Sequence, residues 1–253
     1  MRLDDLTLVV PAKPDPERDA VVSVWLGAGG LVEKLDRFWE PPDHLVPARV
    51  RLYGNDTFCL VVAQQLRLAL ISPDDRVLAA APDSLLHRRV TLRTLGQLVV
   101  NDFPVFVKPA VPKQFRASVF TSLDALRSEC KGLPDHTEVL VSEIVRIRAE
   151  ARAFALDSVV QTVSVYEGTA HHDQAAYFAE RVLQAIDLPR TCVIDVGLLD
   201  DGRWTFIETN STWGAGLNGC DPLRVAPCIA AATVAAQQAV EALVARSTTK
   251  KWG

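Results

Sequence analysis

The sequence lacks the features that define several large classes of protein. It has no excess of positive charge, because 27 Lys and Arg stand against 31 Asp and Glu, giving a net charge of −4. This balance argues against a broad nucleic-acid-binding surface, although it leaves room for a local basic pocket. No apolar stretch reaches the roughly 20 residues that span a bilayer. We therefore expect neither a nucleic acid nor a membrane as a partner.

Cysteine usage and the start of the chain show no sign of secretion. The five cysteines are odd in number, widely scattered, and form no CxxC pair with metal spacing, so we expect reduced, structural thiols. Asp4 and Asp5 precede a short apolar run, without the basic start and long apolar core of a signal peptide. A cytoplasmic location is expected. With 49% hydrophobic and 23% charged residues, the chain should fold around a substantial core.

Residues 1–86 have the pattern of a small α/β lobe. Alternating or apolar runs predict strands and helices, while Gly54 to Thr57 offers a turn and a helix cap. The predicted strands are Leu6 to Val10 and Arg49 to Tyr53, and the predicted helices are Asp19 to Leu26 and the apolar segment Phe58 to Leu70.

Residues 87–253 change to short β segments separated by turns, which predicts mainly antiparallel sheet and an α+β fold class. Strands are predicted at 105–108, 117–120, 138–142, 151–156 and 159–165. Helices are predicted at Leu123 to Cys130, where Ser122 can cap, at Asp173 to Ile186 with Asp173 as cap, and at Val225 to Ala245. The tail from Thr248 should fray.

A predicted hairpin near residue 200 carries the most informative acidic side chains. An apolar strand interrupted by one acid, Asp195, and an alternating strand that contains Glu208 and Asn210 flank the dipeptide Asp201-Gly202. Asp-Gly favours a two-residue type I′ loop, which places Asp195 directly opposite Glu208. Side chains alternate along a strand, so Asn210 shares the face of Glu208.

Two facing carboxylates are destabilising unless something positive lies between them. Carboxylate and amide oxygens are hard ligands, and Mg²⁺ binds one or two carboxylates together with phosphate oxygens and water. Asp195, Glu208 and Asn210 therefore suit a nucleotide-bound magnesium ion. The alternative is a hairpin whose acids face water or pair with arginine.

Lys108 ends an otherwise apolar strand, Phe103-Pro-Val-Phe-Val-Lys108. Its ammonium group cannot stay buried alone, so it either meets an anion or extends to solvent. With the hairpin, this strand resembles the ATP-grasp superfamily of carboxylate-activating ligases over roughly Arg49 to Pro222. The resemblance implies an ATP-grasp fold, ATP and Mg²⁺ as cofactors, and Lys108 on the α and β phosphates.

The segment from Val139 to Glu150 resembles the interlobe linker of that family, expected near residues 142–147. The resemblance implies that Glu143 approaches the adenine amino group, that Glu150 receives the ribose hydroxyls, and that backbone groups of residues 144–146 recognise the ring. Arg88 or Arg89 would lie over the phosphates. The residues assigned to ATP in this way are Arg89, Lys108, Ser142, Glu143, Ile144, Val145, Arg146 and Glu150.

Basic side chains near the phosphates are the candidates for catalysis. Arg152 lies two residues beyond Glu150 on one strand face, so it would meet phosphate or the acyl-phosphate transition state, or else pair with Glu150. Relatives carry a glycine-rich flap after the lysine, but the loop after Lys108 has no glycine. Either side-chain charge from Lys113 or Arg116 replaces the backbone amides, or the flap is weak.

The resemblance implies an ADP-forming carboxylate–amine ligase. Phosphoryl transfer from ATP to a carboxylate gives an acyl phosphate, which an amine attacks to form an amide or peptide bond. The partners would be small-molecule or peptide carboxylates and amines, with the acceptor near the glycine-rich turn of residues 211–219. A kinase, a non-catalytic ATP-binding module and an AMP-releasing nucleotidyl ligase stay open as alternatives, as does a homodimer.

Overall fold

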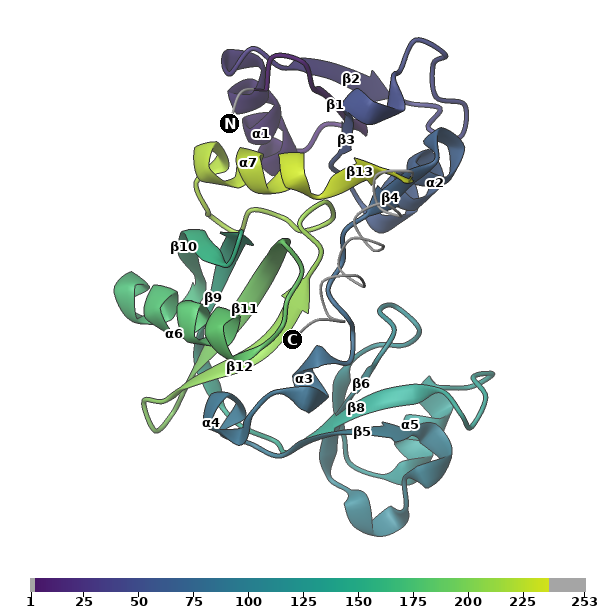
Figure 1. Ribbon diagram of the computed structural model, residues 1–253. Coiled ribbons are helices and arrows are strands. Elements are labelled where there is room, and N and C mark those ends of the chain that lie inside the picture. Colours follow the sequence, from purple (N-terminus) through teal and green to yellow (C-terminus); the bar gives the residue numbers. More distant parts are fainter. Residues whose placement is uncertain (1–2, 237–253) are drawn as a thin grey trace, which may run out of the picture.

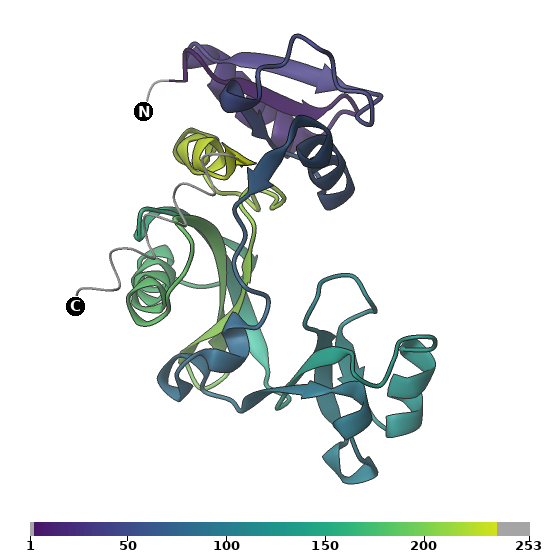
Figure 2. The ribbon, with the colours of Figure 1, turned by 45° about the vertical axis from the view of Figure 1, so that its right-hand side comes forward.

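The computed structural model describes residues 3–236, whose strands form four sheets. Figures 1 and 2 show an N-terminal lobe, a central sheet beside it, and a smaller sheet joined to the central one by thin connections. Helices mix with mainly antiparallel strand pairing, which confirms the predicted α+β class. Among the described residues, no helix combines the length and hydrophobicity that crossing a membrane requires.

The N-terminal lobe is built on a parallel sheet of β1 (Thr7–Pro11), β2 (Leu31–Leu35) and β3 (Val50–Leu52), in the order β2-β1-β3. Helix α1 (Pro16–Gly27) begins where the Asp15 side chain accepts a hydrogen bond from a backbone N–H. Asn55 does the same for α2 (Asp56–Leu66), so the predicted cap is confirmed. The predicted helix to Leu70 is too long, because left-handed Arg67 ends it.

The chain returns to this lobe after residue 221. Helix α7 (Pro222–Ala231) packs in one core with α1, and β13 (Thr233–Ala235) pairs antiparallel with β4 (Leu68–Leu70). The predicted helix from 225 to 245 is therefore wrong in two respects, because the observed helix begins at Pro222 and the chain forms a strand at Thr233–Ala235. The rest of the predicted helix lies outside the described residues, as does the tail from 248. The domain boundary near residue 86 stays a prediction.

The smaller sheet has the order β5-β8-β6-β7 and is antiparallel throughout. Helix α5 (Leu123–Glu129), capped by Ser122 as predicted, packs against it. The strands are β5 (Val90–Thr94), β6 (Val105–Pro109), β7 (Ser118–Phe120) and β8 (Glu138–Ser142). Helices α3 (Val77–Ala80) and α4 (Asp83–Leu86) precede this sheet, and η2 (Leu95–Gln97) and η3 (Val100–Asp102) lie between its strands β5 and β6. The remaining short helix, η1 (Pro47–Arg49), lies in the N-terminal lobe directly before β3.

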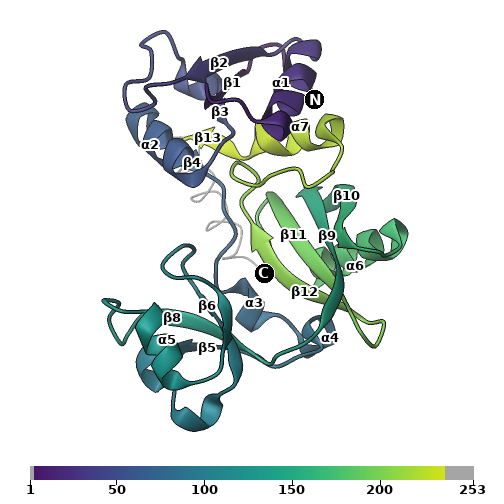
Figure 3. The same ribbon diagram turned by 180° about the vertical axis from the view of Figure 1, so that it is seen from behind.

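The central sheet has the order β10-β9-β11-β12 and is also antiparallel. Its strands are β9 (Ile147–Leu156), β10 (Val159–Gly168), β11 (Thr191–Leu199) and β12 (Trp204–Asn210). Helix α6 (His172–Ala185) lies along one face, as Figure 3 shows from behind. The predicted cap Asp173 is wrong, because the cap position belongs to His171, whose side chain makes no capping hydrogen bond.

The hairpin of β11 and β12 places Asp195 opposite Glu208, as predicted, but by a different route. The backbone N–H of Leu199 donates to the Arg203 carbonyl at 2.9 Å, so the loop is one residue longer than a type I′ turn. This loop alone would shift the pairing by one position. A β-bulge at Ile207 takes up the extra residue and restores the facing pair.

Candidate nucleotide and metal site

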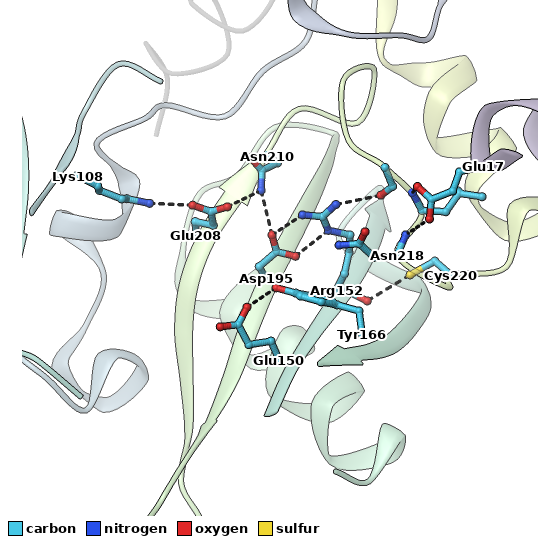
Figure 4. Close-up of polar contacts among 12 residues, drawn as sticks. Glu17, Lys108, Glu150, Arg152, Tyr166, Asp195, Glu208, Asn210, Asn218 and Cys220 are labelled. Atoms are coloured by element: carbon cyan, nitrogen blue, oxygen red, sulfur yellow. Dashed lines mark hydrogen bonds and ion pairs between the residues drawn. The ribbon is translucent and has the colours of Figure 1, made fainter. Parts of the chain in front are cut away.

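Three neighbouring strands bring charged side chains into one row across the central sheet. Arg152 on β9 is the register partner of Asp195 on β11, which in turn is the partner of Glu208 on β12. Arg152 and Asp195 lie at odd spacing from the residues that pack under α6, which puts them on the opposite face of the sheet. Glu208 shares their face because it lies beyond the bulge and opposite Asp195. Figure 4 shows this row with Asn210 beside it. One cation and two anions thus share a single surface.

Arg152 and Asp195 form a buried, two-pronged ion pair. Arg152 Nε donates to Asp195 Oδ1 at 2.8 Å, and Nη2 donates to Oδ2 at 2.7 Å. The side chains are 12% and 2% exposed. Burial raises the pKa of Asp195 above its ordinary value, although the guanidinium opposes that shift. The expected alternative of an acid paired with arginine therefore holds for Asp195.

Two further contacts fix the Arg152 guanidinium. Its Nη1 donates to the Gly216 carbonyl at 3.0 Å, and the Tyr166 ring lies 5.8 Å from its central carbon. The Tyr166 hydroxyl donates to Glu150 at 2.5 Å. The alternative of an ion pair between Arg152 and Glu150 is therefore wrong, because each has another partner.

Glu208 is held between a lysine and an amide. Lys108 Nζ on β6 lies 2.9 Å from Glu208 Oε2, and Asn210 Nδ2 donates to Glu208 Oε1 and to Asp195 Oδ2, at 3.0 Å each. Burial opposes ionisation of Glu208, yet its pKa is lowered because Lys108 and Asn210 outweigh that effect. Lys108 on the smaller sheet therefore forms an ion pair with Glu208 on the central sheet. Of the two outcomes expected for this lysine, an anion or solvent, the structure shows the anion.

The donors at this point fit magnesium in chemical kind. Within residues 3–236, no three His, Cys, Asp or Glu side chains gather as a metal cluster. The third donor is instead the amide of Asn210, and amide and carboxylate oxygens are hard ligands. An amide carries a carbonyl oxygen beside its NH₂ group, so rotation of the Asn210 side chain would turn that oxygen toward a cation. Glu208 and Asn210 are thus suited to hold Mg²⁺, while Asp195 has both oxygens on Arg152.

A cavity of about 290 Å³ lies between the two sheets, next to Lys108 and Glu208. Apolar side chains from both sheets line it, together with the connection that follows β8. It brings together six of the eight residues predicted for ATP: Lys108, Ser142, Glu143, Ile144, Val145 and Glu150. Their individual roles stay predictions. Burial raises the pKa of the Glu150 carboxyl at its edge.

Arg88 and Arg89, the two candidates for the basic residue over the phosphates, point in different directions at the start of the smaller sheet. Arg88 lines the cavity and donates to Ser142 Oγ at 3.1 Å and to the Phe206 carbonyl at 2.9 Å. Burial lowers its pKa to about 10. Arg89 is 77% exposed and pairs with Glu143, and Arg146 is 88% exposed. The sequence left the choice between the two open, with Arg89 among the residues assigned to ATP, and Arg88 is the one that lines the cavity.

A second cavity of about 330 Å³ adjoins the first at Lys108 and Glu208, and Lys113 lines it. The Lys113 ammonium reaches across to Asp56 of the N-terminal lobe, 2.6 Å away. Its backbone adopts a left-handed φ of 67°, a conformation that glycine would favour. The loop after Lys108 therefore contacts the lobe through a charged side chain. Arg116 lies outside the residues that line this cavity.

A third cavity of about 320 Å³ lies where the N-terminal lobe meets the glycine-rich turn. Tyr53 donates to the Ala215 carbonyl at 3.0 Å, and Glu17 accepts from the Leu217 and Asn218 backbone N–H groups. Sequence reasoning missed Glu17, which lies in the first turn of α1 but two residues before the predicted helix Asp19 to Leu26. Contacts between segments so far apart in sequence leave no local pattern.

The five cysteines, Cys59, Cys130, Cys192, Cys220 and Cys228, are all buried and unpaired, as predicted. Burial raises the pKa of each thiol, to about 11 for Cys130 and about 12 for Cys192. They therefore act as apolar core residues and not as nucleophiles.

The fold and the site define an ATP-grasp protein, and the family comparison agrees. The family model described as ATP-grasp domain, R2K clade family 2, matches residues 85–228, more than half of the chain. The chain therefore belongs to the ATP-grasp superfamily, and within it to the R2K clade. No match was found among curated proteins.

Solved structures share the fold at low sequence identity. An ATP-grasp RimK domain protein from Sphaerobacter thermophilus is 16% identical, with a TM-score of 0.56 over 89% of this chain and 98% of the other. The D-cycloserine synthetase DcsG is 19% identical, with a TM-score of 0.53 over 89% and 98%. A D-alanine–D-alanine ligase from Bacillus anthracis is 10% identical, with a TM-score of 0.51 over 90% and 97%. These likenesses establish the ATP-grasp fold.

Proposed function

We propose that this protein is an ATP- and Mg²⁺-dependent ligase that activates a carboxylate as an acyl phosphate for attack by an amine, releasing ADP. The observation that carries the proposal is Glu208, which accepts hydrogen bonds from both Lys108 and Asn210 at the edge of the cavity between two sheets. Family membership and the fold of the synthetase and ligase neighbours support it.

The nucleotide would occupy the cavity between the sheets. Its apolar lining, which includes Phe106, Leu140 and Ile207, suits a flat aromatic base, and the connection beside it supplies Glu143 and the backbone of Ile144 and Val145. Glu150 at the same edge would accept the ribose hydroxyls. Lys108 would then lie at the phosphates, where its present partner Glu208 shows that it already binds an anion.

The side chains around the phosphates would have two different roles, metal binding and stabilisation of the transferred charge. Bound Mg²⁺ would neutralise phosphate charge and fix the geometry of transfer, with Glu208 and Asn210 as its protein ligands. A guanidinium has five N–H donors. Asp195 and Gly216 occupy three of those of Arg152, so the others can stabilise charge on the transferred phosphoryl group.

The acceptor would bind at the third cavity, beside the turn that Arg152 contacts. Polar groups of both the lobe and the turn line this cavity, among them Lys13, Arg18 and Asn55. The reacting carboxylate and amine would thereby be held next to the guanidinium, and positioning would supply most of the rate enhancement. Small polar acids and peptide termini both suit such a cavity.

The test replaces Glu208 with Gln and measures ADP release with Mg²⁺ over a panel of carboxylates and amines. Loss of one charged ligand should lower turnover by at least about 100-fold while the unfolding temperature stays near that of the wild type. The matched control is Glu180→Gln, on the helix behind the sheet. Equal turnover in the two variants would contradict the proposed metal site, and release of AMP would contradict the acyl-phosphate reaction.

A further inference from the structure

Glu17 connects the N-terminal lobe to the charged row of the central sheet. It lies in the first turn of α1, and its carboxylate accepts from two consecutive backbone N–H groups of the glycine-rich turn. The distances are 2.9 Å to Leu217 N and 2.8 Å to Asn218 N. Figure 4 shows the carboxylate facing the turn and not the row. Both of its oxygens are thus used by main-chain donors.

One peptide group carries the connection to Arg152. The N–H of Leu217 and the C=O of Gly216 belong to the same planar peptide unit and point in opposite directions. Glu17 accepts from the N–H end, while the C=O end accepts from Arg152 Nη1 at 3.0 Å. A rotation of this peptide plane would therefore break both contacts. An ionised acceptor on the N–H also polarises the peptide, which strengthens the carbonyl as an acceptor.

The turn is shaped to allow this approach. A Cβ added to Gly216 would lie 2.7 Å from Glu17 Oε2, so only glycine lets the carboxylate come this close. The following residues Asn218 and Gly219 both have left-handed φ, at 48° and 83°. Such a backbone does not fix the direction of its carbonyls by regular secondary structure. The carboxylate supplies that direction instead.

We propose that Glu17 is a positioning residue for Arg152, acting through the Gly216–Leu217 peptide group. The N-terminal lobe then completes the active site, because Asp195 fixes the guanidinium from one side and the Glu17-held carbonyl fixes it from the other. This inference rests on the proposed function only where it assumes that Arg152 stabilises charge on the transferred phosphoryl group. The hydrogen bonds themselves concern only how firmly the Arg152 side chain is held in place.

The test compares Glu17→Gln with the control Asp19→Asn, whose exposed side chain pairs with Lys34 instead. Gln keeps the shape but offers one oxygen in place of two. Side-chain ¹⁵N NMR of Arg152, assigned with Arg152→Lys, reports rotation of the guanidinium group. Rotation should accelerate in Glu17→Gln and stay at the wild-type rate in Asp19→Asn. ADP release should fall about 10- to 100-fold in kcat, since small misplacement costs that much, with little change in KM for ATP.

The outcomes separate the inference from the proposed function. Unchanged Arg152 rotation in Glu17→Gln overturns the inference, whatever the turnover. If rotation changes in Glu17→Gln while both Glu17→Gln and Arg152→Lys keep full turnover, the positioning contact is supported. The same result contradicts the proposed role of Arg152 in stabilising the transferred phosphoryl group. If Glu17→Gln does not fold, Gly216→Ala provides the second variant. It leaves Glu17 intact and displaces its carboxylate, so it should also free the guanidinium.

Discussion

Replacing Arg152 with Met should destabilise the protein far more than removing a surface arginine. Asp195, 2% exposed, would keep its charge, and its one remaining side-chain partner within residues 3–236 would be the amide of Asn210. Breaking a buried ion pair by removing one member costs about 3–5 kcal/mol, because the remaining charge stays desolvated. We expect a loss of that size in the free energy of unfolding at neutral pH.

The matched control is Arg190→Met. Arg190 makes the same two-pronged contact with Asp157, but the side chains are 53% and 58% exposed. Exposed pairs contribute about 0–1 kcal/mol. Urea unfolding at 25 °C, followed by tryptophan fluorescence and circular dichroism, measures both variants. An Arg152→Met loss no larger than that of Arg190→Met would refute the reasoning.

The stability loss of Arg152→Met should depend on pH. Burial already raises the pKa of Asp195, and Arg152 is the main group that opposes the shift. Without it the folded-state pKa rises further above the unfolded value of about 3.9. A carboxyl with a raised folded pKa destabilises the fold above that pKa and has no such effect below the unfolded value. The deficit of Arg152→Met should therefore be largest near neutral pH and shrink on acidification.

Two other changes test the surroundings of the site. Lys108→Met removes the cation beside Glu208, so affinity for an ATP analogue with Mg²⁺, measured by calorimetry, should fall about 10- to 100-fold, as expected for a hydrogen bond to a charged group; unchanged affinity would place the phosphates elsewhere. The five buried thiols should resist an aromatic disulfide reagent at pH 8 and react fully in urea; rapid reaction of the native protein would contradict their burial.

Local chemistry explains what the sequence predicted well. Asn55 and Ser122 are capping residues before apolar runs, and both cap helices as expected. Alternation along the hairpin placed Asn210 with Glu208. The lysine at the end of an apolar strand did find an anion. Each of these features depends on residues close together in the chain, so its physical cause is visible in the sequence.

The misses arise from contacts between distant segments. Nothing near Arg152 in sequence shows that its strand lies beside the strand of Asp195, so Glu150 was considered as its partner instead. Arg88 and Arg89 differ by one position, and only the packing of Arg88 against Phe206 decides which faces the cavity. The hairpin shows a further limit, because a longer loop and a bulge compensated each other and left the predicted facing pair intact.

A crystal structure with a non-hydrolysable ATP analogue and Mg²⁺ tests the central claim most directly. We expect the adenine between the two sheets beside Glu143, the phosphates at Lys108, and the metal on Glu208 and Asn210. A nucleotide bound away from Lys108, or a metal with neither Glu208 nor Asn210 among its ligands, would contradict the assignment.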